Sequence, residues 1–372
     1  EVMFFRQLAA LRCYAKLHGY GLMVLTPSET CGDHSIFFHK HCRVAEVLES
    51  MPQGFAAFVM DADVVPVVME RGLDEWLDGG EDLVFYEREW SNEMAAGNYI
   101  ARHTPFTIDF LRAWANYSQK APKTGFSSDD NGAIHVLLNE VLHVPCAGYV
   151  RQLYNNLTND GMDKLGVPLP YKRFIAAAHM ARGPPRQWIN VHLESSWGNI
   201  TVLPRMHGWV MDGDGSFNKA NAEIGSVFHH RVKTSADMDR YYDPYEGVEE
   251  CKVRENAFVD QETYLSNVNT YITAMAVQYG LWSLPSGEPV PFFLAITQCC
   301  AEKLQCRPLR PREVLHIGAQ AFPDPWAVVN ASGGLARACG AEPGIYRPLP
   351  VPPPACGDGD PSTGHGGVPA AS

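Results

Sequence analysis

The pattern of apolar and polar positions divides the first part of the chain into alternating helical and extended segments. Apolar residues three and four positions apart indicate helices, whereas short continuous apolar runs indicate buried strands. The predicted helices span residues 1–18, 37–51, 73–79, 105–118 and 127–142. The predicted strands span residues 19–25, 55–60, 82–86 and 95–101.

This alternation predicts an α/β fold with a mostly parallel sheet and helices on both of its faces. In such sheets, ligands bind beyond the carboxyl ends of the strands. From about residue 176 to 235 the chain becomes richer in strands and loops. Because the chain opens in a helix that runs directly into a strand, we expect an earlier strand of the fold to be missing from it.

Composition divides the chain into three regions. Residues 1–235 contain the alternating elements and are predicted to form the main domain. Residues 236–282 combine a polar loop with a predicted helix at 262–282, and residues 283–372 are irregular and rich in Pro and Gly. The tail from about residue 341 has too few apolar side chains to bury, so we expect it to be disordered.

The overall composition excludes several classes of protein. The chain has 372 residues, of which 46% are hydrophobic and 19% charged, which is typical of a globular protein. Its formal net charge of -12 argues against binding to nucleic acid or to an anionic membrane surface. No apolar stretch reaches the length of a membrane span, so a membrane is expected only through an anchor that this chain does not show.

Cysteines and glycosylation sequons favour the secretory lumen over the cytosol. The ten cysteines are scattered, and no two have the C-x-x-C spacing of a structural zinc ribbon. Four Asn-x-Ser/Thr sequons begin at Asn116, Asn156, Asn199 and Asn330. Such sequons also arise by chance, so they support this compartment only together with the cysteines.

Two aspartates, Asp61 and Asp63, directly follow the apolar run in the string "GFAAFVMDADVVPV". A pair of carboxylates at a strand end can bind Mg²⁺ or Mn²⁺, and the ion can in turn neutralise a diphosphate. The pair can also simply cap a junction between strand and loop. In "HKH" at residues 39–41 we expect a helix surface, with Lys40 and Arg43 as the better candidates for phosphate contact.

The string "WVMDGDGSF" at residues 209–217 suggests two other chemistries. It resembles the first motif of haloacid-dehalogenase-type phosphatases, but no apolar strand ending in paired aspartates follows it, as that chemistry requires. A calcium loop would run from Asp212 to Glu223, but Phe217 stands where a Gly should make the sharp turn. A Gly-rich turn with solvated acids is the better interpretation of this string.

Several longer strings together resemble one family. They are "FFHKHCRVAEVL", "FVMDADVVPV", "DLVFYEREWSNEMAAGNYIARHTPF", "FLRAWANY" and "SSDDNGAIHVLL". In this order and spacing they resemble the nematode-abundant domain-of-unknown-function family 273 and, more distantly, the galactosyl- and xylosyltransferases of glycosyltransferase family 34. The resemblance covers roughly residues 1–235. It implies a GT-A, Rossmann-like nucleotide-sugar transferase domain without its first strand, followed by an irregular extension.

The resemblance also implies roles for individual residues. His229, in "FHHRVK", is the expected third metal ligand beside Asp61 and Asp63, although His230 lies in the same string and the register between them stays open. The expected donor-binding residues are Asp61, Ala62, Asp63, Ala96, Gly97, Asn98, Lys40 and Arg43. The expected catalytic residues are Asp129, Asp130 and Asn131.

The activity implied is Mn²⁺- or Mg²⁺-dependent transfer of a sugar from a UDP-sugar to a hydroxyl of a glycan or glycoconjugate, with retention of anomeric configuration. The resemblance places such an enzyme in the Golgi lumen, as a single-pass type II membrane protein when full-length. A non-catalytic carbohydrate-binding or scaffold protein on a degenerate transferase fold is the alternative, and a phosphatase is the third interpretation.

Overall fold

The computed structural model describes most of the first 254 residues and three short strands beyond them. The described ranges are 4–32, 35–88, 93–144, 147–161, 166–182, 187–203, 208–211, 226–243 and 251–254. The later strands are β9 (Trp282–Ser283), β10 (Pro289–Val290) and β11 (Arg307–Pro308), which form a small sheet. The predicted tail from 341, the helix predicted at 262–282 apart from its last residue, and the loop from Asp212 to Glu223 lie outside the described residues.

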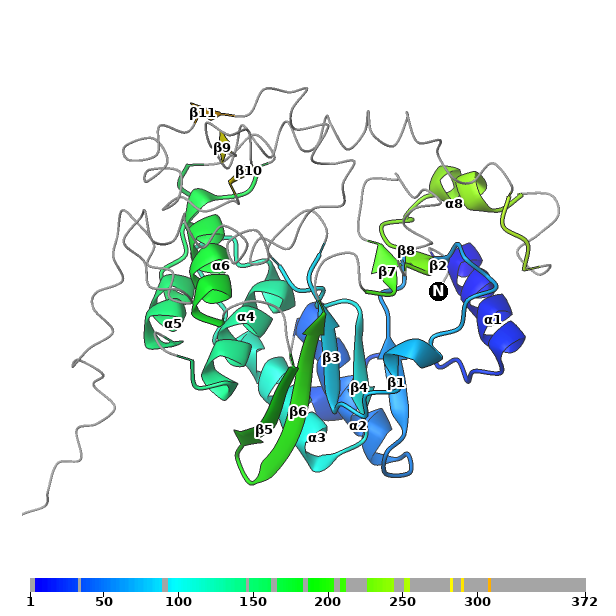
Figure 1. Ribbon diagram of the computed structural model, residues 1–372, viewed down its shortest axis with the longest axis horizontal. Coiled ribbons are helices and arrows are strands. Elements are labelled where there is room, and N and C mark those ends of the chain that lie inside the picture. The colour runs from blue at the N-terminus through cyan, green and yellow to red at the C-terminus, as the bar shows by residue number, and fades with distance from the viewer. Residues whose placement is uncertain are drawn as a thin grey trace, which may run out of the picture.

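A five-stranded sheet with the strand order β1-β4-β3-β6-β5 forms the centre of the fold (Figure 1). Its strands are β1 (Ala56–Val59), β3 (Leu83–Tyr86), β4 (Tyr99–Arg102), β5 (Gln187–Leu193) and β6 (Ser196–Leu203). Only β3 and β6 pair in parallel, and the other three pairs are antiparallel. The architecture is thus mixed α/β, and the prediction of a mostly parallel sheet is wrong.

The strand connections explain two of the three antiparallel pairs. Between β3 and β4 the described residues form an antiparallel bridge from Glu87 to Met94 rather than a crossover helix. A two-residue turn joins β5 to β6. Strands joined without a crossover run antiparallel, whereas the parallel pair β3–β6 is separated by several helices.

The strand predicted at 19–25 is also absent. Residues 20–28 have no regular secondary structure, and the side chains of Leu22, Met23 and Val24 are exposed. An apolar run forms a stable strand only when a neighbouring strand supplies hydrogen-bond partners. Among the described residues, β1 is the edge of its sheet and no strand pairs with its outer side.

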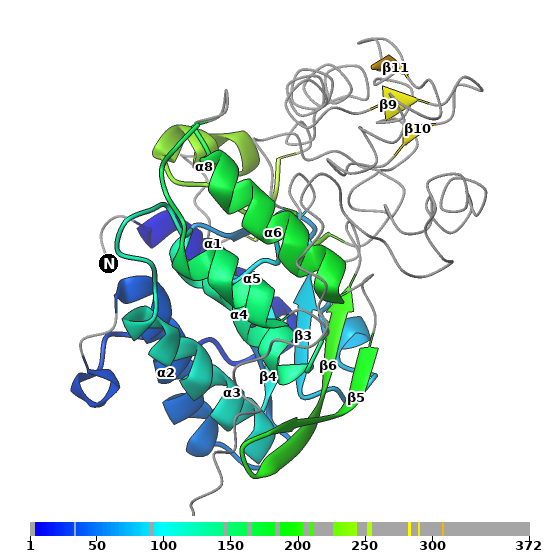
Figure 2. The same cartoon turned by 90° about the vertical axis from the view of Figure 1, so that its left-hand side faces the viewer.

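Helices cover both faces of the sheet. In Figures 1 and 2, helices α2 to α6 lie on one face of the sheet, and α1 lies on the other. The helices are α1 (Phe5–His18), α2 (Ile36–Glu49), α3 (Pro105–Asn116), α4 (Asp129–Val141), α5 (Ala147–Asn155), α6 (Leu169–Arg182) and α8 (Ser235–Tyr241). Leu83 and Phe85 join the core under α2 to α6, whereas Val84 and Tyr86 join the core under α1. Both faces of β3 are buried, which explains why its sequence is a continuous apolar run.

The helix boundaries follow from local chemistry. Thr104 accepts a hydrogen bond from the backbone N–H of Thr107 and is followed by Pro105 at the first helical position, so α3 begins there. Thr234 and Asp237 form a capping box that begins α8. Helix α6 extends to Arg182, so the strand-rich region expected from about residue 176 begins only at β5.

A second, three-stranded sheet places residues 226–232 next to the turn that follows β1. It consists of β2 (Val65–Pro66), β8 (Phe228–His229) and β7 (Val210–Met211), in the order β2-β8-β7. Val65 pairs with His229, and the N–H of Val232 donates to the carbonyl of Asp63 at 2.9 Å. These contacts hold the "FHHRVK" segment against the Asp61–Asp63 turn.

Two disulfides connect parts of the domain. Cys13 of α1 is bonded to Cys251, and Cys31 is bonded to Cys42 of α2. In the described part of the chain, every helix is too short or too polar to cross a membrane.

Candidate metal centre and its carboxylates

Asp61 and Asp63 lie in the turn that follows β1, with the exposed Ala62 between them. The N–H of Val64 donates to the carbonyl of Asp61 at 3.2 Å and closes this turn. The N–H of Asp61 donates to the side-chain oxygen of the buried Asn98 at 3.3 Å. The turn is therefore tied to the segment that precedes β4, and it presents two carboxylates at the carboxyl end of β1.

His230 completes a group of possible metal ligands with these aspartates. Its Nε2 lies 3.1 Å from Oδ1 of Asp63 and 3.7 Å from Oδ2 of Asp61. One ligand atom from each of the three residues lies within 4.8 Å of the others. Two carboxylates and an imidazole suit Mn²⁺, and carboxylate oxygens suit Mg²⁺. The group therefore has the donor chemistry that the expected ion requires.

The neighbouring His229 points elsewhere. Its side chain is buried, and its Nδ1 lies 2.7 Å from the hydroxyl of Tyr241. Adjacent residues of an extended segment project to opposite sides, so only one of the two histidines can face the aspartates. The structure brings His230 to them, in the position that the resemblance assigned to His229.

Two cations lie next to the carboxylates. Nζ of Lys40, on α2, lies 3.2 Å from Oδ1 of Asp61, and Nζ of the exposed Lys233 lies 3.7 Å from Oδ2 of Asp63. Burial raises the pKa of Asp63, but the hydrogen bond and charge of His230, with Lys233, outweigh it and hold the pKa below its usual value. Asp63 is thus ionised at neutral pH, as metal binding requires.

Lys40 also contacts a second carboxylate, that of Asp130. Nζ of Lys40 lies 2.9 Å from Oδ2 of Asp130, whose side chain is 1% exposed in the first turn of α4. Burial raises the pKa of Asp130, but Lys40 and His41 outweigh this effect and lower it. Asp130 is therefore a buried, ionised carboxylate linked to the candidate metal centre through one lysine.

His41 holds Asp130 from the other side. Its Nε2 lies 3.0 Å from Oδ2 of Asp130, and its Nδ1 lies 2.9 Å from the hydroxyl of Tyr99. Its ring stacks on Trp114, whose indole N–H donates to the backbone carbonyl of Asp130 at 3.1 Å. The "HKH" string was expected on a helix surface, but residues two apart on a helix lie about 200° apart, so His41 is buried while His39 is not.

The other expected catalytic residues flank Asp130. Burial and the charge of Asp130 raise the pKa of Asp129, which has a positive φ of 48°. Asn131 accepts a hydrogen bond from the N–H of Ala96 at 3.3 Å through its side-chain oxygen. One turn later, Nε2 of His135 accepts from the N–H of Met94 at 3.1 Å. Helix α4 thus fixes the backbone that precedes β4 at two alternate residues.

Gly97 lies where this backbone meets the candidate metal centre. A Cβ on Gly97 would lie 1.8 Å from Oδ2 of Asp61, so only glycine leaves room for the carboxylate. Ala96 and Asn98 on either side are buried. The three expected donor residues of this segment therefore shape the wall behind Asp61.

Residues 11–163 match the family model of DUF273, described as a protein of unknown function. The match includes Lys40, Asp61, Asp63 and Asp130, and it ends before His230. It supports the DUF273 part of the resemblance and carries no activity with it. No curated protein matches the chain.

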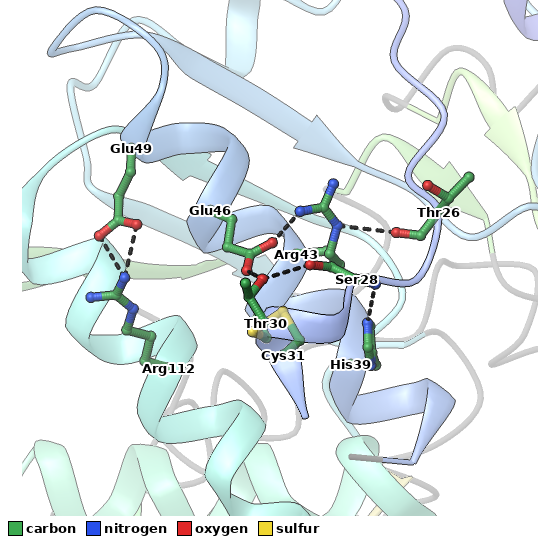
Figure 3. The surroundings of a disulfide bond; sticks show 10 residues. Thr26, Ser28, Thr30, Cys31, His39, Arg43, Glu46, Glu49 and Arg112 are labelled. Carbon is green, nitrogen blue, oxygen red and sulfur yellow. Dashed lines mark hydrogen bonds and ion pairs between the residues drawn. A yellow bond between two sulfur atoms is a disulfide. The ribbon is translucent and has the colours of Figure 1, made fainter. Parts of the chain in front are cut away.

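Arg43 also lies within the DUF273 match, and Figure 3 shows it between Thr26 and Glu46. Its Nε donates to the carbonyl of Thr26 at 3.0 Å, and its guanidinium pairs with Glu46. The Cys31–Cys42 disulfide holds the same segment against α2. The described contacts of Arg43 do not include the aspartates, and its expected contact with phosphate stays a prediction. Cys31, Cys42 and Glu46 also lie close together, but their sulfurs are bonded to each other and are not free ligands.

Sequence reasoning missed two residues of the site and left a third unresolved. His41 was missed because helical spacing shows that His39 and His41 lie on different faces but not which of the two is buried. Lys233 was missed because a single exposed lysine carries no pattern. The choice of His230 over His229 depends on the pairing of β8 with β2, which the sequence does not show.

Proposed function

We propose that this protein is a metal-dependent glycosyltransferase with a GT-A fold, related to glycosyltransferase family 34. It would transfer a sugar from a UDP-sugar to a hydroxyl of a glycan or glycoconjugate. The observation that carries the proposal is the convergence of Asp61, Asp63 and His230 at a strand end, with Lys40 joining them to the buried Asp130. An ion site beside an ionised carboxylate is what diphosphate departure and sugar transfer both require.

Each group has a distinct task in this reaction. Asp61, Asp63 and His230 would hold Mn²⁺ or Mg²⁺, which supplies positive charge for the departing diphosphate. Lys233 is exposed beside Asp63 and is placed to contact the same phosphates. Gly97 and Asn98 position Asp61 by leaving room for its side chain and by binding its backbone. Lys40 orients Asp130 toward the centre.

Asp130 carries the proposed chemistry at the sugar. Its charge is held in a water-poor environment by Lys40 and His41, where a carboxylate stabilises developing positive charge far more than in water. With retention of configuration, Asp130 would stabilise an oxocarbenium-like transition state or form a covalent intermediate with the anomeric carbon. Both roles need the carboxylate to be ionised.

The proposed location is the Golgi lumen, as a single-pass type II membrane protein. The two disulfides support a compartment that permits disulfide formation. This location would supply both nucleotide-sugar donors and glycan acceptors.

Calorimetric titration with UDP tests the proposal. We expect UDP to bind the wild-type protein in Mn²⁺ and not in EDTA, and Asp63→Ala to lose the binding. Glu75→Gln is the matched control, because Glu75 is a surface carboxylate that pairs with Arg71. A screen of UDP-sugars for Mn²⁺-dependent hydrolysis would then identify the donor. A folded protein that binds no UDP in Mn²⁺ would reject the transferase and favour the non-catalytic alternative.

A further inference from the structure

Lys40 stands between two carboxylates that have different tasks. Its Nζ lies 3.2 Å from Oδ1 of Asp61 and 2.9 Å from Oδ2 of Asp130. Asp61 belongs to the candidate metal centre, whereas Asp130 is the buried carboxylate of α4. The same ammonium group therefore lies within hydrogen-bonding distance of both carboxylates and neutralises part of the charge of each.

A metal ion at the centre must compete with the cations already there. Oδ1 of Asp61 is occupied by Lys40, and Oδ2 of Asp63 lies 3.7 Å from Nζ of Lys233. Lys233 is mostly exposed and can move into solvent. Lys40 is mostly buried, with only 22% of its side chain exposed, so its route away from an arriving dication leads to Asp130.

Asp130 depends on the same lysine. Its other side-chain partners are the imidazole of His41 and, at 3.5 Å, the amide of Asn131. Lys40 is the one permanently charged side chain among the described partners of this carboxylate. A buried carboxylate is costly without a cation, so Asp130 draws Lys40 away from Asp61.

We propose that Lys40 is a shared counter-ion that couples the metal centre to Asp130. Ion binding at Asp61 and Asp63 moves Lys40 onto Asp130, and loss of charge on Asp130 returns Lys40 to Asp61. Because binding linkage is reciprocal, each site changes the other by the same factor. The inference rests on the proposed function for its metal centre and adds a positioning role for Lys40 that depends on ion occupancy.

Titration of Mn²⁺ alone into a set of variants tests this coupling without any substrate. Asp130→Asn should weaken Mn²⁺ binding roughly fivefold, because Lys40 then pairs fully with Asp61. Lys40→Gln should tighten it, because the competing cation is gone. In the Lys40→Gln background, Asp130→Asn should change Mn²⁺ affinity by less than about twofold. Arg112→Gln, which removes a cation from the exposed pair with Glu49, is the matched control and should leave Mn²⁺ affinity unchanged.

If Lys40→Gln does not fold, two further variants still test whether Lys40 couples Asp130 to Mn²⁺ binding. The double variant K40Q/D130N has no unpaired buried charge at this position and should bind Mn²⁺ more tightly than D130N alone. Lys40→Arg retains the cation, so Asp130→Asn should weaken Mn²⁺ binding in that background as it does in wild type. Thermal unfolding of every variant verifies that it is folded.

The possible outcomes separate the inference from the proposed function. If Asp130→Asn weakens Mn²⁺ binding equally with and without Lys40, its charge acts directly on the ion and the shared counter-ion is rejected, while the metal centre stands. If the folded wild-type protein binds no Mn²⁺, the metal centre and the inference are rejected together.

Discussion

His41 and Asp130 form a buried pair in which Nε2 of the imidazole lies 3.0 Å from Oδ2 of the carboxylate. Burial lowers the pKa of His41 to about 4, although Asp130 acts in the opposite direction. At neutral pH the ring is therefore neutral, and its two nitrogens have fixed roles. Nε2–H donates to Asp130, and Nδ1 accepts from the hydroxyl of Tyr99, whose pKa is raised well above its usual value by burial.

The neutral His41 makes the stability of the protein depend on pH. Its pKa falls from 6.5 in the unfolded chain to about 4 in the folded protein, so the unfolded chain binds more protons between these values. The contribution is therefore complete above pH 6.5 and is lost as pH falls toward 4. We expect the free energy of unfolding to fall by about 2 kcal/mol more for wild type than for His41→Gln between pH 7 and pH 5.

Urea unfolding at the two pH values measures this difference. Other groups that titrate in this range, such as the buried His135, are present in both proteins and cancel in the comparison. Equal losses of stability in wild type and His41→Gln would contradict the assignment of a neutral His41.

Gly97 is predicted to be essential for Mn²⁺ binding at the candidate metal centre, although it contributes no side chain. Gly97→Ala places a methyl group 1.8 Å from Oδ2 of Asp61, so the carboxylate must turn away. We expect Mn²⁺ affinity to fall by about 10- to 100-fold, the usual effect of disturbing a residue that orients a ligand. Calorimetry measures the affinity. Gly148→Ala is the control, since a Cβ there meets nothing within 4 Å, and its affinity should stay at the wild-type value.

The positions of several elements were predictable from the sequence because their local patterns agree with their surroundings. The helix predicted at 105–118 is observed as Pro105–Asn116, with its start set by Thr104 and Pro105. The strand predicted at 55–60 is observed as Ala56–Val59, directly before Asp61. Local spacing and capping decide such elements, so a single sequence is enough to find them.

Pairing and orientation were not predictable, because they depend on distant parts of the chain. The apolar run at 19–25 can form a strand only beside another strand that supplies hydrogen bonds. Among the described residues no strand pairs with it. Lys40 and Arg43 are three residues apart and neighbours on α2, so the sequence grouped them. The segment around Thr26, held by the Cys31–Cys42 disulfide, draws Arg43 away from Asp61.

The two adjacent histidines should behave differently when each is changed. His230→Asn removes a possible ligand beside Asp63, and we expect Mn²⁺ affinity to fall more than about tenfold. His229→Asn leaves the hydroxyl of Tyr241 without its buried partner, which should cost about 1–3 kcal/mol of stability. The folded His229→Asn protein should still bind Mn²⁺ as wild type does.

Calorimetry with Mn²⁺ and urea unfolding separate these two effects. Tyr241→Phe is the matched control for His229→Asn, because it removes the hydrogen bond between Tyr241 and His229 without changing the "FHHRVK" segment. Loss of Mn²⁺ binding in His229→Asn, with binding retained in His230→Asn, would reverse the assignment and restore the register expected from the resemblance.

The sequons predict which asparagines carry glycans if the protein matures in the secretory lumen. Asn116 and Asn156 are exposed at or just after the ends of α3 and α5. Asn199 lies within β6, partly buried, and its side-chain oxygen accepts from the N–H of Asn190 at 3.1 Å. We expect glycans on Asn116 and Asn156 and none on Asn199, because only the first two side chains project freely from the fold.

Secretion from insect cells behind a cleavable leader allows a direct count of these glycans. All variants would carry Asn330→Gln, so that only sequons within the described residues contribute. Treatment with peptide N-glycosidase should then shift the parent protein by two glycans, and Asn116→Gln or Asn156→Gln should each remove one. Asn199→Gln should leave the pattern unchanged. A secreted, folded protein with no shift, or with a shift that depends on Asn199, would show that exposure in the fold does not select the sites, and the support for a lumenal enzyme would then rest on the disulfides alone.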